Sequence, residues 1–132
     1  MKSIFSMNWL SSIQPRKQRK FRHNAPEHIK GEFLNAPLSS SLKTKYGIRS
    51  LRVRTGDKVK VMKGQFKGTT GIVEKVSLTK TRVYVKGCEI VKKDGNKVLY
   101  PIHPSNVLIT TVVEDKKRFK QTTPKKSSEV NK

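Results

Sequence analysis

The sequence has few acidic residues and few of the features that mark membrane or secreted proteins. It contains 9 Asp and Glu against 30 Lys and Arg, so its 132 residues carry a formal net charge of +21. Its one cysteine, Cys88, excludes an internal disulfide bond and weakly favours a reducing compartment. No apolar run approaches the roughly 18 residues that a membrane-spanning helix needs. These shortages are typical of one small basic domain with extensions.

The charge predicts an acidic partner. A net charge of +21 on so short a chain repels itself unless something neutralises it. Nucleic acid is favoured over an anionic membrane surface or an acidic protein, because the basic residues run the whole length and form no single amphipathic stripe. Hydrophobic residues make up only 33% of the chain, so we expect part of it to be too polar to pack alone.

Residues 1–13 do not closely resemble a secretory signal peptide. Asn8 and several serines interrupt the apolar character of residues 1–13, which argues against a signal peptide. No acid precedes Glu27, and Ser and Arg are present, so a mitochondrial presequence stays an alternative.

Valine marks the expected core. None of the thirteen valines precedes Val53, and ten of them lie within residues 51–109. Apolar residues alternate with charged ones in five or six short strands, near 51–53, 59–61, 72–76, 83–85, 98–102 and 107–109. The neighbours Ile72 and Val73 break the alternation and predict a bulge. So few strands cannot form two full sheets, and a small barrel removes their exposed edges. We therefore expect a mainly β fold.

Three other zones surround this core. Residues 1–24 lack periodicity and are expected to form an extended basic segment. Residues 25–50 are expected to form two short helices, one beginning at Pro26 and ending at 35–37, the other capped by Ser39 and stopped by Gly47. Residues 110–132 are expected to form a basic C-terminal tail with at most a turn or two of helix.

The segment TGDKVKVMKGQFKGTTGIVEKV at 55–76 carries the strongest functional signal. Gly64 and Gly68 let the backbone turn sharply with positive φ and approach a partner closely. Lys63 and Lys67 add charge to this loop, and Phe66 is able to stack on a base or sugar. On this segment alone, an ordinary hairpin with Phe66 capping the barrel end is an equally good interpretation.

Two further groups of basic residues predict contacts with phosphate. One is the N-terminal run, in which a phenylalanine is interleaved: Arg16, Lys17, Arg19, Lys20, Phe21, Arg22 and His23. A solvated tail or a nuclear-localisation patch is the alternative, and RNA contact is favoured. The other is the exposed strand face: Arg52, Arg54, Lys58, Lys60, Lys80, Arg82 and Lys86. Any one of these is an ordinary solvated side chain, but seven together favour phosphate contact.

Residues 55–76 resemble the KOW motif, and further segments fall in the same order as in one family: RKFRHN at 19–24, APEH at 25–28, APLS at 36–39, KYGIRS at 45–50 and IHPSNV at 102–107. Over about residues 14–120 the chain is similar to the eukaryotic and archaeal family of ribosomal protein L twenty-six, or universal protein L twenty-four. Here the C-terminal region is shorter than is usual in eukaryotic members, and a start at Met7 fits the family's spacing better. These departures favour a reduced eukaryotic ribosome.

The resemblance implies an SH3-like barrel with basic extensions, bound to large-subunit rRNA near the peptide-tunnel exit, with an early role in assembly. Implied partners are neighbouring ribosomal proteins and factors at the tunnel exit. Neither a membrane nor a homo-oligomer is expected. The implied location is the cytoplasm, after nuclear and nucleolar transit. Within the matched segments, further candidate RNA-binding residues are Asn24, Arg49, His103 and Ser105.

Catalysis is poorly supported, and no cofactor or metal is expected. His23, His28 and His103 lack metal-site spacing with Cys88, which is expected to be a small buried apolar group. The acids Asp57 and Asp94 suit turns. Trp9 has no assigned role. The alternatives are a KOW-type transcription or chromatin factor and a mitochondrial ribosomal protein; an enzyme is disfavoured.

Overall fold

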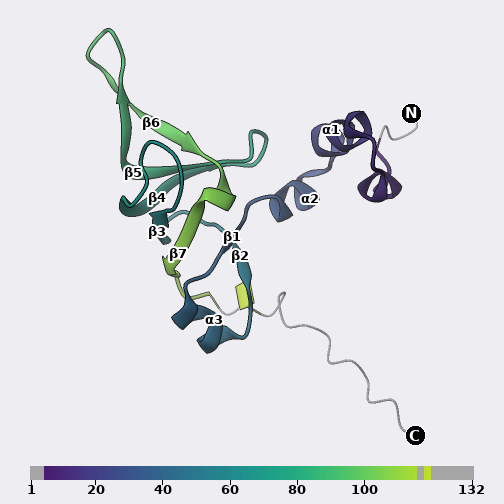
Figure 1. Cartoon of the computed structure of the whole chain (residues 1–132), viewed down its shortest axis with the longest axis horizontal. Helices are drawn as coiled ribbons and strands as arrows, with labels where there is room; N and C mark the ends of the chain where they lie inside the picture. The colour runs from purple at the N-terminus through teal and green to yellow at the C-terminus, as the bar shows by residue number, and fades with distance from the viewer. Residues whose placement is uncertain (1–4, 116–117, 120–132) are drawn as a thin grey trace, which may run out of the picture.

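The protein is mainly β, as the alternating valines predict (Figure 1). A computed structural model describes residues 5–115 and 118–119. Five strands form one antiparallel sheet in the spatial order β6-β5-β4-β3-β7. They are β3 (Lys58–Val61), β4 (Thr70–Ser77), β5 (Arg82–Val91), β6 (Lys97–Ile102) and β7 (Val107–Thr111). This sheet is the framework of the expected small barrel-like domain.

Every second side chain along strand β3 is buried, and these side chains form part of the core of this domain. In β3, Val59 and Val61 are buried while Lys58 and Lys60 are exposed, because successive side chains of a strand point to opposite faces. The other strands add further buried residues to the same cluster: Val73, Val83, Val85, Cys88, Ile102, Val107 and Ile109. The pairing of β4 with β5 shifts register between residues 73 and 75, which confirms the expected irregularity in this strand.

Residues 35–37 form a strand, where the end of a helix was expected. β1 (Asn35–Pro37) pairs antiparallel with β2 (Ser50–Arg52) in a separate two-stranded sheet. Leu34, Ala36 and Leu38 are completely buried in the main core, and Leu38 forms a parallel bridge with Ile109 of β7. The core therefore includes residues before position 51, because burial of three apolar side chains outweighs the turn signals Asn and Pro.

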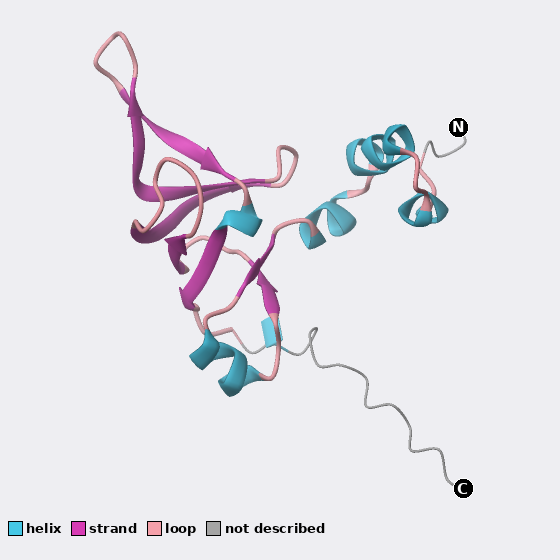
Figure 2. Ribbon diagram, in the orientation of Figure 1, coloured by secondary structure: helices cyan, strands magenta, loops and turns pink. Residues whose placement is uncertain are grey.

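The helices are short and lie around this framework (Figure 2). They are η1 (Met7–Ser11), α1 (Pro15–Asn24), α2 (Glu27–Glu32), α3 (Ser40–Tyr46) and η2 (Pro104–Asn106), where η marks a 3-10 helix. α2 and α3 confirm the two short helices expected within 25–50. Gly47 ends α3 with φ +67°, in the left-handed conformation that glycine adopts easily. No helix of the described residues is long and apolar enough to cross a membrane.

Helix α1 corrects the expectation that residues 1–24 are extended. Its Arg, Lys and Gln residues are good helix formers, and Pro15 occupies the first turn. The helix has one buried apolar residue, Phe21, which packs with Ala25 and Ile29 in a second small core. This module, η1 with α1, lies to one side of the main sheet (Figure 1). Residues 1–4 are outside the described range.

The expected C-terminal tail at 110–132 also begins later than predicted. Strand β7 continues to Thr111, Val112 is 8% exposed, and Arg118 is buried. These residues belong to the folded body. Residues 116–117 and 120–132 lie outside the described residues, so the remainder of the tail stays a prediction.

Candidate nucleic-acid interface

The loop between β3 and β4 has the tight geometry that its glycines predict. Gly64 and Gly68 have φ of +95° and +90°, and the amide of Gly68 donates to the carbonyl oxygen of Val61 at 2.8 Å. A Cβ added to either glycine would meet no atom within 4 Å. The glycines are thus needed for their backbone conformation, and the outer side of the loop is open to a partner.

Phe66 caps the end of the barrel. Its side chain is half-buried against the main core, and its ring centroid lies 5.3 Å from that of Tyr100 in β6. The structural interpretation of Phe66 is therefore confirmed. RNA contact through the part of the ring that stays accessible remains a prediction.

Substituting the loop glycine should matter more than removing a loop lysine. Gly68→Val forces a β-branched residue into positive φ, so we expect thermal unfolding to show a loss of about 1–3 kcal/mol. Lys67→Ala removes one exposed cation and should change stability by less than about 0.5 kcal/mol. Incorporation into large subunits is the second measurement. If Gly68→Val matches the parent chain in both measurements, the proposed role of the loop at 64–68 is wrong.

The N-terminal module displays its cations on the surface of α1. Arg16, Lys17, Arg19, Lys20, Arg22 and His23 are all exposed, whereas Phe21 is 2% exposed. Phe21 is therefore the buried apolar residue that packs the module together, and an RNA contact by this residue stays a prediction. The half-buried Asn24 has its side-chain oxygen 2.9 Å from Nδ1 of the His23 ring, within hydrogen-bonding distance.

Two of these cations lie over aromatic rings. Lys20 Nζ lies 4.6 Å from the ring centroid of Trp9, and the guanidinium of Arg22 lies 5.4 Å from that of Phe33. The Gln18 side-chain amide donates to the carbonyl oxygens of residues 9, 10 and 12, which ties α1 to η1. Trp9 thus has a structural role, which its isolated position in the sequence did not reveal.

In the predicted basic strand face, the lysines and the arginines differ in their surroundings. Its lysines are exposed, together with Arg49 and the loop lysines: Lys58, Lys60, Lys63, Lys67, Lys80 and Lys86. Arg52 places its guanidinium over Gly31 of α2, where an added Cβ would overlap it, and Arg54 pairs with Asp115 at 2.6 Å. Arg82 is half-buried and donates to the carbonyl oxygen of Thr81 at 3.3 Å. The lysines are therefore freer than the arginines to contact phosphate.

His103 and Ser105 form a small turn at the end of β6. The His103 Nδ1 accepts from the Ser105 amide at 3.3 Å and lies 2.8 Å from its hydroxyl oxygen, which confirms the expected turn role. Burial, with the nearby positive charges of Arg82 and Arg22, lowers the pKa of His103. The lowered pKa favours the neutral form of the ring at pH 7.

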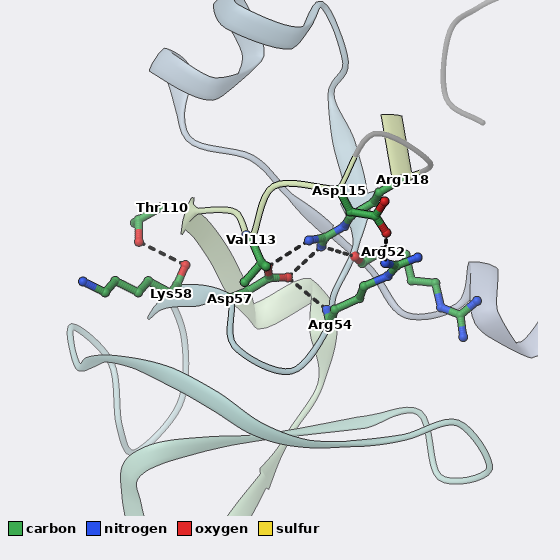
Figure 3. A network of polar contacts seen from close by, with 8 residues as sticks. All are labelled: Arg52, Arg54, Asp57, Lys58, Thr110, Val113, Asp115 and Arg118. Carbon is green, nitrogen blue, oxygen red and sulfur yellow. Dashed lines mark hydrogen bonds and ion pairs between the residues drawn. The ribbon is translucent and has the colours of Figure 1, made fainter. Parts of the chain in front are cut away.

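A buried ion pair, missed from the sequence, anchors the neighbouring backbone (Figure 3). Asp57 is fully buried, and both its oxygens accept from Arg118, at 2.9 and 2.6 Å. Asp57 also accepts from the amides of Arg54 and Val113, at 2.9 and 3.1 Å. The pair thus joins the turn before β3 to the segment after β7, residues 61 positions apart in the sequence.

The described residues contain no cluster of three or more His, Cys, Asp or Glu side chains placed to hold a metal ion. Cys88 is completely buried, as expected, and burial raises the pKa of its thiol. Its thiol therefore stays protonated and unreactive at neutral pH.

The chain is similar to archaeal ribosomal proteins over most of its length. It is 54% identical over 101 residues to the large ribosomal subunit protein uL24 of Methanocorpusculum labreanum, which covers 76% of this chain and 84% of that protein. It is 48% identical over 106 residues to the uL24 protein of Methanocella arvoryzae, which covers 80% and 85%. The family that comprises the eukaryotic ribosomal proteins L26 and their archaeal L24 counterparts matches residues 12–125. The chain therefore belongs to this family of structural, non-enzymatic proteins of the large ribosomal subunit.

Proposed function

We propose that the chain binds large-subunit rRNA near the peptide-tunnel exit and assists early assembly of the subunit. The observation that carries the proposal is the exposed cation set of α1. Ion pairs between described residues join Arg54 to Asp115 and Arg118 to Asp57, and none involves α1. Five permanently charged side chains on one short helix therefore remain available for phosphate.

The open loop at 64–68 adds a second point of attachment on the barrel. Its outer side carries exposed Lys63 and Lys67, and its positive-φ glycines leave the backbone uncovered. Extensive phosphate contact combined with close backbone approach is typical of proteins that recognise folded RNA by shape. The alternative of a transcription or chromatin factor is not supported, because the family match extends through both the N-terminal helices and the barrel.

Salt dependence tests this proposal. We expect the affinity of the full chain for large-subunit rRNA to fall steeply with salt, because bound cations displace counterions from phosphate. Replacing the five cations of α1 together with glutamine should make the slope of log affinity against log salt shallower by about 0.7–0.9 for each phosphate that the variant no longer neutralises. The set is Arg16, Lys17, Arg19, Lys20 and Arg22.

Glutamine is the appropriate replacement because it keeps the helix propensity of α1 while it removes the charge. Far-ultraviolet circular dichroism of the variant should match the parent chain. An unchanged slope in a variant that keeps its helix content would show that α1 does not contact phosphate.

The cellular setting belongs to the same proposal. Family membership supports association with the ribosome, and we propose a cytoplasmic location, preceded by nuclear and nucleolar transit. Neighbouring ribosomal proteins and factors at the tunnel exit are the proposed protein partners. Exposed basic residues of α1 are available to an import receptor before assembly, so transit and rRNA binding would use the same surface in succession.

A further inference from the structure

A pocket of about 210 Å³ lies between the 64–68 loop and the end of β6. Its lining includes two aromatic residues, Phe66 and Tyr100, whose ring centroids lie 5.3 Å apart with a 50° tilt. Two cations, Lys63 of the loop and Arg82 of β5, line it, with the exposed Gln65 beside them. The pocket is thus lined by residues of the loop, of β5 and of β6, which no local sequence pattern connects.

The charge around this pocket favours an anionic ligand. The described residues that line the pocket include Lys63 and Arg82, and none of them is acidic. His103 also lines the pocket. Burial, together with the nearby charges of Arg82 and Arg22, lowers the pKa of His103.

We propose that this pocket receives one unstacked nucleotide of the rRNA. The base lies against Phe66 and Tyr100, and Lys63 and Arg82 hold its phosphate. A cavity of this size admits one base and excludes a base-paired stem, and bases splayed out from single-stranded loops are the ones that stack on aromatic side chains. The inference rests on the proposed rRNA-binding function and adds the kind of RNA feature that the barrel recognises.

A matched pair of charge substitutions tests the pocket. Gln65→Glu places a negative charge inside it without changing the size of an exposed side chain. Asn96→Asp makes the same charge change at the exposed turn between β5 and β6, outside the pocket. Binding of the full chain is measured with two probes at one salt concentration: a single-stranded RNA dodecamer of mixed sequence, and the same strand in an RNA duplex.

We expect Gln65→Glu to weaken single-strand binding about fivefold or more, because it opposes both the phosphate contact and the stacking that depends on it. Asn96→Asp should change it less than about twofold, and duplex binding should change less than about twofold for both variants. Equal effects of the two variants, or an equal loss of duplex binding by Gln65→Glu, would overturn the pocket proposal while the rRNA-binding function stands. If the parent chain binds neither probe nor rRNA, both proposals fail.

A second pair keeps the test independent of added negative charge. Lys63→Ala removes a lysine that lines the pocket, and Lys67→Ala removes one from the same loop outside it. Lys63→Ala should weaken single-strand binding at least twice as much as Lys67→Ala. Equal losses would mean that the loop acts as a general positive surface, which contradicts a nucleotide pocket.

Discussion

Asp57→Ala should lower the free energy of unfolding by about 3–5 kcal/mol, because it leaves the Arg118 guanidinium buried without its carboxylate. The side chains of Arg118 and Asp57 are 3% and 0% exposed, so water cannot replace the lost partner. The substitution also removes the acceptor of two backbone amides, those of Arg54 and Val113. Denaturant unfolding of the free protein measures the change.

Asp94→Ala is the control for this prediction. Asp94 is an exposed acid in the turn between β5 and β6, and its loss should cost less than about 0.5 kcal/mol. If the two variants are equally stable, Asp57 does not hold the segment after β7 against the barrel. Arg118→Met should recover part of the loss in the double variant, because it replaces a buried charge with an apolar side chain of similar length.

Gly71→Ala should destabilise the barrel by about 3 kcal/mol, at the upper end of what overpacking usually costs. A methyl group at Gly71 would overlap the Lys86 carbonyl oxygen of β5 and would lie 2.7 Å from Val85 Cγ1. Since the oxygen belongs to the backbone of the neighbouring strand, relief requires β4 and β5 to move apart. Thermal unfolding measures the effect.

Thr70→Ala is the matched control for Gly71, one residue earlier in β4. Thr70 is exposed, so its truncation should change stability by less than about 0.5 kcal/mol. A stable Gly71→Ala variant would show that β4 and β5 do not approach each other this closely. Gly71 and Gly68 are needed for different reasons. At Gly71 an added side chain would overlap neighbouring atoms, whereas at Gly68 the strain would come from the positive φ, since no atom lies within 4 Å of an added Cβ.

The sheet was predictable because each of its strands carries its own pattern. Valines alternate with lysines in β3, and the turn glycines at 56, 64, 68 and 95 adopt positive φ. These signals are local, so the neighbouring sequence alone contains them. The same holds for α3, in which Ser39 and Gly47 mark the two ends.

Helix α1 and strand β1 were not predictable by the same reasoning. In α1 charge conceals the helical period, since Phe21 is its one buried residue and the aromatic rings that it contacts, Phe5 and Phe33, lie outside the helix. In β1, Asn35 and Pro37 are typical of a loop, and the strand exists because Ala36 and its apolar neighbours are buried against β7. Both elements therefore depend on burial against residues outside their own segments, which a local sequence pattern does not show.

The candidate site shows the same division. Most of the cations expected at the surface are exposed, because charge is a property of each residue, whereas Arg82 is half-buried. The role of Asp57 depended on Arg118, and the pocket depended on Tyr100 of β6 meeting Phe66. Contacts between residues so far apart in the sequence leave no local pattern.

Ultraviolet cross-linking of purified large subunits tests directly whether the chain contacts rRNA through α1 and the end of the barrel. After irradiation and digestion, mass spectrometry maps the peptides of this chain that carry nucleotides. The proposed rRNA contact predicts cross-links in peptides of α1 and in those that span the 64–68 loop or the end of β6. A chain that is present in the subunits with no rRNA cross-link in either region would contradict it.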